Sequence, residues 1–432
     1  MKKKFLLIPM LAGVMLAASC SKDDGTAVVD EIVVPNETPE AVAEQPAAQK
    51  TYPFSVQASK ETSISKIALD GYDLKFDGGE TLLLVLEDDE TKYVELDFVS
   101  GAGTTTATFS KDLSEDEKTL IEGKKLWGVI KGKSSLDEVQ YSTTSLEDAV
   151  NQYCSLRSTE AITYEDGKAS DDLTLADEKA YIEFNVADGQ KQVSLKRADK
   201  SEYSWYPVNE EKDQVWLAVP GAVKYNTRLK NSILPAESGK VYTLKSADVM
   251  DLGPDFSVLW ATCNLGATTP TEFGNYYSWG EIITKTEFTS ENYTASELST
   301  DLDNEHDAAY NFEYETGKKL GDKGFRMPTK AEAGELFAAG NSTQEWKAWK
   351  SGSDDVYGYE FTNAYGTIFL PACGFYNASD LNEDNEAGYY WSTTYSGNTY
   401  AWCVLIANVA WAGTNVTLRT QGKSIRPVRS LN

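Results

Sequence analysis

The hydrophobic and polar positions alternate with a period of two from Tyr52 to about Ala247. Residues 94–98 and 182–186 show this clearly, because single polar or acidic residues separate their apolar side chains. Such alternation is typical of half-buried β-strands. Glycine-containing turn sequences separate the segments at 77–79, 188–189 and 220–221. Many short strands with such turns predict antiparallel β-sandwiches.

One segment of this region has the spacing of a helix instead. The apolar side chains of residues 146–153 fall on one helical face, and Ser145 and Asp148 have the spacing of a capping box. We expect this helix to link two β-domains. The first β-sandwich domain is predicted at 51–146, and the linking helix with the second β-sandwich domain at 147–248.

The pattern changes near Met250, because few long periodic stretches follow. The best helix covers residues 330–339: Thr329 caps its start, Glu332 takes the third position and Gly340 ends it. Short strands are predicted at 367–370, 389–392, 399–406 and 424–429. Seven of the ten tryptophans lie beyond Met250. The third domain, 249–432, is therefore predicted to be an α+β domain with a small helical share.

The beginning of the chain is organised like an export signal. Three lysines precede an apolar run at residues 5–16, and small residues lead to Cys20. The run is too short to span a bilayer as a helix, which needs roughly 20 apolar residues. A cysteine at this place resembles the lipobox of bacterial lipoproteins, in which its thiol takes a diacylglycerol. The resemblance implies a signal peptide at 1–19 and a lipid anchor at Cys20 in the cell outer membrane.

The residues after Cys20 indicate on which side of that membrane the protein lies. Polar and acidic residues follow at once, and this resembles the signal that sends Bacteroidetes lipoproteins to the outer face. A solvated tether would have the same composition. Residues 20–50 contain three prolines and no aromatic side chain, so we predict a flexible acidic tether.

Composition narrows the partners and the chemistry. The 432 residues carry a net charge of −27, which disfavours nucleic acid as a partner. His306 is the single histidine, so a two-histidine zinc site is excluded and a Ser-His-Asp triad is disfavoured. Apart from Cys20 the cysteines are Cys154, Cys263, Cys373 and Cys403. A disulfide between Cys373 and Cys403 is the first expectation, with buried free thiols as the alternative.

Two resemblances extend this interpretation. The first is carried by the lipobox and the segments 52–58, 146–164, 180–186, 215–220 and 239–244, in that order. They resemble fimbrillin-like proteins of Bacteroidales, which implies fimbrial subunits as partners. The third domain resembles the Fibrobacter succinogenes major paralogous domain, which implies a C-type-lectin-like fold. The motifs that carry this second resemblance are Asp251-Leu-Gly and the segments 258–267, 274–281, 324–332, 368–375, 388–392 and 424–428. The catalytic cysteine pair of the related sulfatase-modifying enzymes has no counterpart in this sequence.

A lectin-like domain needs a surface for its ligand. Exposed aromatic side chains stack on sugar faces, so Trp411, Trp391, Tyr390 and Tyr395 are candidate ligand-binding residues. For Trp391, as for Trp260 and Trp279, a core position is favoured over a ligand-binding one. Arg326 is expected to pair with a nearby carboxylate at the start of the helix.

Two acidic segments have the oxygen ligands that calcium prefers. Asp380, Asn382 and Asp384 alternate along one candidate loop. The other runs from Asp301 to Asp307, and solvated loops are the alternative for both. No other cofactor is predicted.

The sequence as a whole favours a surface-exposed outer-membrane lipoprotein that acts in binding or adhesion. Its ligand would be a glycan or a host-surface molecule. A glycoside hydrolase with paired carboxylates and a structural envelope protein without a specific ligand are the alternatives. No catalytic residue is predicted.

Overall fold

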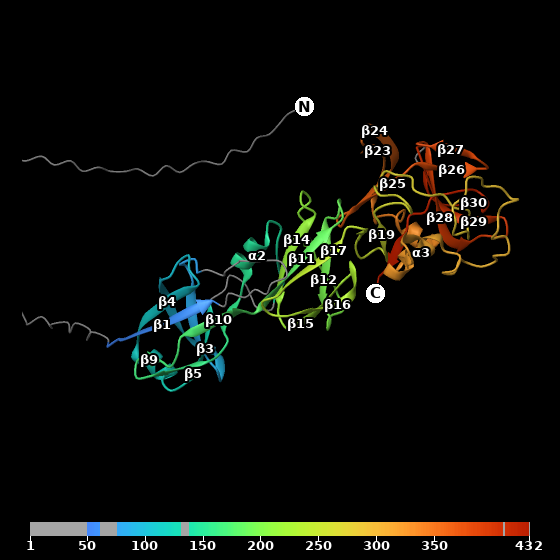
Figure 1. The fold of residues 1–432 in the computed structure, drawn as a ribbon. Coiled ribbons are helices and arrows are strands. Elements are labelled where there is room, and N and C mark those ends of the chain that lie inside the picture. The colour runs from blue at the N-terminus through green and yellow to red at the C-terminus, as the bar shows by residue number, and fades with distance from the viewer. Residues whose placement is uncertain (1–49, 61–75, 131–137, 409–410, 432) are drawn as a thin grey trace, which may run out of the picture. The chain divides into compact units, whose positions relative to one another are not determined.

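The computed structural model describes residues 50–60, 76–130, 138–408 and 411–431 (Figure 1). The predicted signal peptide, Cys20 and nearly all of the predicted tether lie outside the described residues. Within the described part, most residues are in β-strands and the helices are short. None of these helices has both the length and the apolar character needed to cross a membrane.

The first β-domain is one sheet that closes on itself. Its strand order is β2-β3-β4-β1-β10-β7-β5-β8-β9, and β2 also pairs with β5. The strands are β1 (Tyr52–Lys60), β2 (Thr81–Leu86), β3 (Asp89–Ser100), β4 (Thr106–Leu113), β5 (Lys125–Ile130), β7 (Leu156–Ser158), β8 (Ile162–Glu165), β9 (Lys168–Ala169) and β10 (Leu173–Asp177). The predicted sandwich is therefore wrong for this domain. Alternation determines which side chains are buried, but it does not determine which strands meet at the two ends of a sheet.

The first domain also contains a helix that the hydrophobic pattern did not predict. Helix α1 (Glu115–Ile121) begins after Ser114, whose side chain accepts a hydrogen bond from the Glu117 N–H. The Glu117 carboxylate in turn accepts from the Ser114 N–H, at 2.9 Å. These two bonds form a capping box, which is a sequence signal that can be recognised before the structure is known.

The chain crosses between the two β-domains more than once. Strand β6 (Gln140–Ser142) pairs with β14 of the second domain, and α2 (Leu146–Tyr153) follows it, capped by Ser145 as predicted. Strands β7 to β10 then return to the first sheet, where β10 pairs in parallel with β1. The predicted boundary at residue 146 is therefore wrong, because residues 156–177 belong to the first domain.

The second β-domain is a sandwich of two four-stranded sheets, as predicted. One has the order β17-β11-β14-β6 and the other β13-β12-β15-β16. The strands are β11 (Lys179–Val186), β12 (Gln192–Arg197), β13 (Ser204–Pro207), β14 (Gln214–Pro220), β15 (Val223–Thr227), β16 (Lys230–Ala236) and β17 (Val241–Ser246). Strands β11 and β17 pair in parallel, so the sheets are not wholly antiparallel. Apolar residues of β11, β12, β14 and β15 form its buried core.

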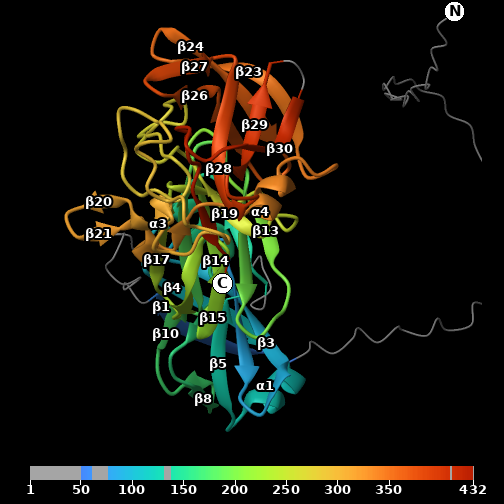
Figure 2. The same cartoon turned by 90° about the vertical axis from the view of Figure 1, so that its right-hand side faces the viewer.

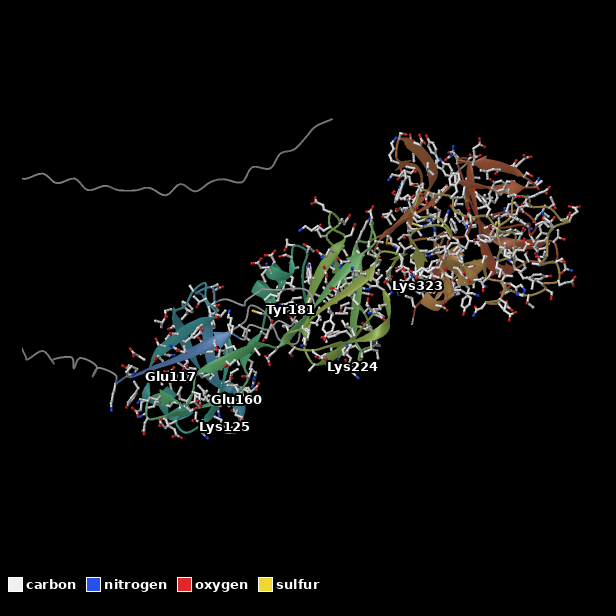
Figure 3. The ribbon with its side chains drawn as sticks, viewed as in Figure 1. Glu117, Lys125, Glu160, Tyr181, Lys224 and Lys323 are labelled. Carbon is white, nitrogen blue, oxygen red and sulfur yellow. The ribbon has the colours of Figure 1, made fainter. Side chains whose placement is uncertain are left out.

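A buried carboxyl group lies where the chain leaves the first sheet and enters β11. Asp177 is 6% exposed and accepts hydrogen bonds from the Tyr181 hydroxyl at 2.6 Å and the Ser155 N–H at 3.1 Å. Tyr181 is labelled in Figure 3. Burial raises the pKa of Asp177 to about 6, although these bonds and Lys179 oppose the shift. The folded protein thus holds the Asp177 proton more tightly than the unfolded chain does.

We expect the Asp177→Asn variant to be less sensitive to pH than the wild type. The raised pKa stabilises the fold below about pH 4, and this contribution is lost as the pH rises through about 6. The free energy of unfolding in urea, measured at about pH 4.5 and about pH 7, should differ between the two pH values. The variant should reduce this difference by up to about 2 kcal/mol. Asp171→Asn, at an exposed position, is the control. An unchanged difference in Asp177→Asn would contradict the prediction.

The third domain combines small sheets with long loops (Figure 2). Its sheets have the orders β18-β19-β31-β22, β20-β21, β23-β24-β25 and β27-β26-β28-β29-β30. The first two contain β18 (Val249–Met250), β19 (Val258–Ala261), β20 (Glu313–Glu315), β21 (Lys318–Lys319), β22 (Phe325–Arg326) and β31 (Val428–Ser430). The other two contain β23 (Thr343–Ser351), β24 (Asp354–Thr362), β25 (Thr367–Pro371), β26 (Cys373–Asn377), β27 (Asp380–Asp384), β28 (Ala387–Tyr395), β29 (Tyr400–Ala407) and β30 (Trp411–Leu418). The short helices are α3 (Ala308–Asn311), η1 (Leu320–Lys323) and α4 (Lys330–Glu335).

The sequence predicted the start of α4 better than its end. Thr329 caps the helix and forms a capping box with Glu332, and Arg326 pairs with the Glu332 carboxylate through both terminal nitrogens. Both predictions are confirmed. The helix ends at Glu335 rather than at residue 339, because side chains take its last carbonyls: Asn341 donates to Glu335 and Ser342 to Leu336. The predicted strand at 424–429 is likewise shorter and begins at Val428.

Buried polar contacts join the second β-domain to the third domain. Gln190 is fully buried; its amide nitrogen donates to the carbonyls of Asp251 and Tyr365, at 2.8 and 2.9 Å. The Arg228 Nε lies 3.1 Å from both carboxylate oxygens of Asp251. The largest influence on the Asp251 pKa is burial, which raises it against the lowering effect of Arg228. An ion pair and an amide of this kind require specific partners, so they orient the contact.

Candidate functional site

Two of the predicted ligand-binding residues lie in the core instead of on the surface. Trp391 is 0% exposed and its indole N–H donates to the Tyr277 carbonyl at 2.7 Å. Tyr390 is 2% exposed and its hydroxyl donates to the Pro371 carbonyl. Neither ring is available to a ligand, so these two assignments are wrong. Both faces of β28 are covered by the domain, which periodicity cannot show for an aromatic run.

The other two predicted ligand-binding residues are Tyr395 and Trp411. Tyr395 is half-buried at the end of β28, and its hydroxyl donates to the Asn398 side chain at 2.6 Å. Trp411 begins β30, where it pairs with Ala407. The Trp411 side chain lies outside the described part of the structure. Its role as a ligand-binding residue stays a prediction.

The acidic segments do not gather into a metal site among the described residues. Asp380, Asn382 and Asp384 lie on strand β27 and not in a loop. In the other segment the Asp307 carboxylate caps α3 and accepts from the Met327 N–H at 2.8 Å. Asp301 accepts from the Tyr395 N–H. No group of three or more carboxylate, thiol or imidazole side chains in the described part is arranged to hold a metal ion.

The cysteines and the histidine have structural surroundings. All four described cysteines are free, so the predicted disulfide between Cys373 and Cys403 is not formed. Both thiols are buried, and burial raises the pKa of Cys403 to about 12. The thiols are therefore protonated and unreactive near neutral pH. His306 is partly exposed in an acidic loop, with Nδ1 2.8 Å from the Asp303 carboxylate.

An apolar surface does exist, on the strands next to the predicted residues. In the β29–β30 register Tyr400 is opposite Leu418 and Trp402 is opposite Val416, so the four side chains share one face. Tyr400 is 46% exposed, Val416 39% and Leu418 37%, and Trp402 is half-buried. Figure 2 shows β28, β29 and β30 as neighbours in this sheet. We call these four side chains the β29–β30 platform.

Helix α4 determines where the platform ends. The helix contacts β28, β29 and β30, and further along the same face Val404 and Ile406 are buried in the core. The Lys330 ammonium, at the start of α4, lies 3.2 Å from the centre of the Trp402 ring. A cation over an indole face is attracted by the ring quadrupole. The platform therefore combines one exposed phenol ring, one partly covered indole and two aliphatic side chains.

A buried arginine holds the long loops beside this sheet. Arg419 directly follows β30 and is 1% exposed. It donates to the Tyr293 hydroxyl at 2.9 Å and to the carbonyls of Ala295, Leu298 and Asn398 at 2.7, 3.0 and 3.1 Å. Its guanidinium carbon also lies 4.4 Å from the centre of the Trp279 ring. Among the described residues it forms no ion pair with a carboxylate, so carbonyl dipoles and aromatic faces compensate its charge.

The same domain has a pocket of about 420 Å³. Its apolar lining comes from Ala261, Phe312, Leu320, Phe325 and Pro427, and Cys263 also lines it. At its edge the Lys323 ammonium lies 3.9 Å above the Tyr314 ring, and Figure 3 labels this lysine. The volume is in the range of small-ligand pockets.

Sequence reasoning missed the platform because it looked for motifs. Tyr400, Trp402, Val416 and Leu418 belong to none of the quoted motifs. Strand β29 is mostly apolar on both faces, so its pattern does not show which face meets solvent. One signal was present: Ala387 to Leu418 contain no charged residue, in a chain that is 25% charged. A stretch without charged residues is typical of the core or of an uncharged surface. In this protein part of the stretch is buried in the core and part of it forms the platform.

Comparisons with known proteins give limited information. No family model matches the chain, and no curated protein matches it. Solved structures with some likeness include a fimbrial protein from Bacteroides ovatus ATCC 8483, at 10% identity over 89% of this chain and 100% of that chain, with a TM-score of 0.24. A fimbrial assembly protein from Parabacteroides distasonis ATCC 8503 is 12% identical over 45% of this chain and 92% of that chain, with a TM-score of 0.25. TM-scores of this size carry no argument about the fold or function of this chain.

Proposed function

We propose that this chain is a lipid-anchored protein of the outer cell surface that binds a neutral glycan through the β29–β30 platform. The observation that carries the proposal is the platform itself, an exposed aromatic and aliphatic face on a rigid sheet. The lipobox that ends at Cys20 supports the surface location. We further propose that the third domain belongs to the Fibrobacter succinogenes major paralogous family, with its C-type-lectin-like fold, on the strength of its ordered motifs.

The chemistry of the platform favours a sugar without charge. Tyr400 presents a ring with a polar hydroxyl at its tip, which suits the apolar face and hydroxyl rim of a pyranose. Positions two residues apart on a strand are about 6.6 Å apart, so Tyr400 and Trp402 span a short stretch of a polysaccharide. The net charge of −27 would repel an anionic glycan. The Lys330 ammonium, which lies over the Trp402 ring, is a single positive charge against this repulsion.

The structure gives the glycoside hydrolase alternative no specific support. In the third domain the buried carboxylates of Asp251, Glu281 and Asp307 each accept from backbone N–H groups, at 3.0, 2.7 and 2.9 Å. Asp251 also pairs with Arg228, and Glu281 with Lys285. Groups held in this way stabilise loops and helix ends. A glycan that was shortened during the binding assay would favour the enzyme over the adhesin.

We expect Tyr400→Ala and Trp402→Ala each to weaken glycan binding about tenfold or more, since each removes a stacking ring. The assay is a glycan array with the full chain, followed by calorimetry with the best neutral oligosaccharide. Tyr357→Ala is the matched control, because Tyr357 is 42% exposed in the same domain but lies on β24. No binding to any neutral glycan, or equal losses in the control, would overturn the proposal.

A further inference from the structure

Strand β30 is an unusual edge. It is the last strand of the order β27-β26-β28-β29-β30, so no strand of the described residues pairs with its other side. It contains no charged residue and no proline. The edge strands β23 and β27 of the same domain carry Lys347, Lys350, Asp380 and Asp384, among others. Exposed edges are normally protected from pairing by such charges.

The hydrogen-bond pattern shows which backbone groups β30 presents. Just beyond the strand the Arg419 N–H donates to the Thr399 carbonyl at 3.1 Å, so this pair bonds inward, toward β29. In an antiparallel ladder the bonding alternates along the strand. Thr417, Asn415 and Gly413 therefore bond to β29. The N–H and C=O groups of Leu418, Val416, Thr414 and Ala412 point to the free side.

Local bonds cover two of these outward groups. The Val416 N–H donates to Oδ1 of the neighbouring Asn415 side chain at 2.8 Å. The Leu418 carbonyl accepts from the Gln421 N–H at 3.3 Å. The N–H and C=O of Thr414 have no partner among the described residues. Thr414 is thus the centre of a short row of backbone groups that can pair with another strand. In this row the Val416 N–H is already bonded to the Asn415 side chain.

We propose that two copies of this chain associate through β30, paired antiparallel about a two-fold axis at Thr414. Thr414 then exchanges both of its outward bonds with Thr414 of the partner subunit. Ala412 is opposite Val416 of the partner subunit, and Val416 is opposite the partner's Ala412. The strand is small or β-branched at these positions, so the side chains on the platform face meet without a clash.

The charge of the chain restricts where a second copy can bind. Each copy carries a net charge of −27, so two copies repel each other over most of their surface. They can meet closely only where the surface is uncharged, and the stretch from Ala387 to Leu418 provides such a surface on both. An isologous contact places the same patch of each copy against itself. The association would bring two platforms together on one continuous sheet.

The test is the oligomeric state of the full chain, purified as Cys20→Ala so that detergent is not needed. Sedimentation velocity up to about 100 µM should show a reversible dimer, tighter at about 0.5 M than at about 0.15 M NaCl because salt screens the repulsion. Thr414→Lys adds a charge to the edge, and Thr414→Pro removes the outward N–H without removing a bond to β29. Each should weaken the dimer at least about tenfold.

Two further variants make the outcome decisive. Asn415→Ala frees the Val416 N–H and should tighten the dimer, an effect that a folding defect would not produce. Thr343→Lys, at an exposed position at the start of β23, controls for added charge and should dimerise like the wild type. A wild type that stays monomeric under both salt conditions overturns the proposal. A dimer that both Thr414 variants leave unchanged overturns it as well.

Discussion

The Arg419→Met variant is expected to lose about 3 to 5 kcal/mol of the stability of its third domain. The side chain is 1% exposed and donates to the Tyr293 hydroxyl and to four carbonyls of the loops around it. Methionine fills a similar volume but leaves these acceptors buried without donors, at roughly 1 to 3 kcal/mol each. Removing the buried charge also removes its desolvation cost, so the net loss is smaller than the sum.

Urea unfolding followed by tryptophan fluorescence measures this loss, because seven of the ten tryptophans lie in the third domain. Hydrogen exchange should show that protection falls first in residues 281–307, which include the Ala295 and Leu298 carbonyls that Arg419 holds. Arg197→Met is the matched control, since Arg197 pairs with Asp199 at the surface with 38% of its side chain exposed. Such pairs contribute about 1 kcal/mol or less. A loss in Arg419→Met as small as in this control would show that the guanidinium bonds are dispensable.

The Cys20→Ala variant is expected to move from the membrane fraction to the soluble fraction almost completely. Acyl chains contribute about 0.8 kcal/mol for each buried methylene, so several chains on one residue hold the protein firmly. Without the thiol no diacylglycerol can be attached. Fractionation with mass spectrometry of the mature N-terminus measures both the location and the modification.

Cys263→Ala is the control for this experiment. Cys263 is a half-buried free thiol of the third domain, and its loss should leave the protein on the membrane. Retention of Cys20→Ala in the membrane fraction, or an unacylated mature N-terminus in the wild type, would remove the anchor from the proposed function. Glycan binding and self-association would remain separate questions, since both concern the third domain.

The candidate site shows where sequence reasoning succeeded and failed. Trp279 and Trp260 are buried, at 0% and 1% exposure, which confirms the core alternative for both. The same alternative was correct for Trp391, whereas the ligand-binding assignment was wrong. An aromatic residue in a strand that is covered on both faces looks the same in sequence as one that meets solvent. The exposed ring of Tyr400 and the half-buried ring of Trp402 could be found only from the register of β29 with β30.

The sequence by itself determined the local features of this protein. Alternation predicted most of the strands, and capping residues placed the starts of α2 and α4, because both depend on neighbours within a few positions along the chain. Only the tertiary structure decided that β2 pairs with β5, that residues 156–177 return to the first domain, and that part of one face of β29 and β30 stays open. These features arise from contacts between residues far apart in sequence. Their free energy depends on which surfaces meet, and a one-dimensional pattern does not contain that information.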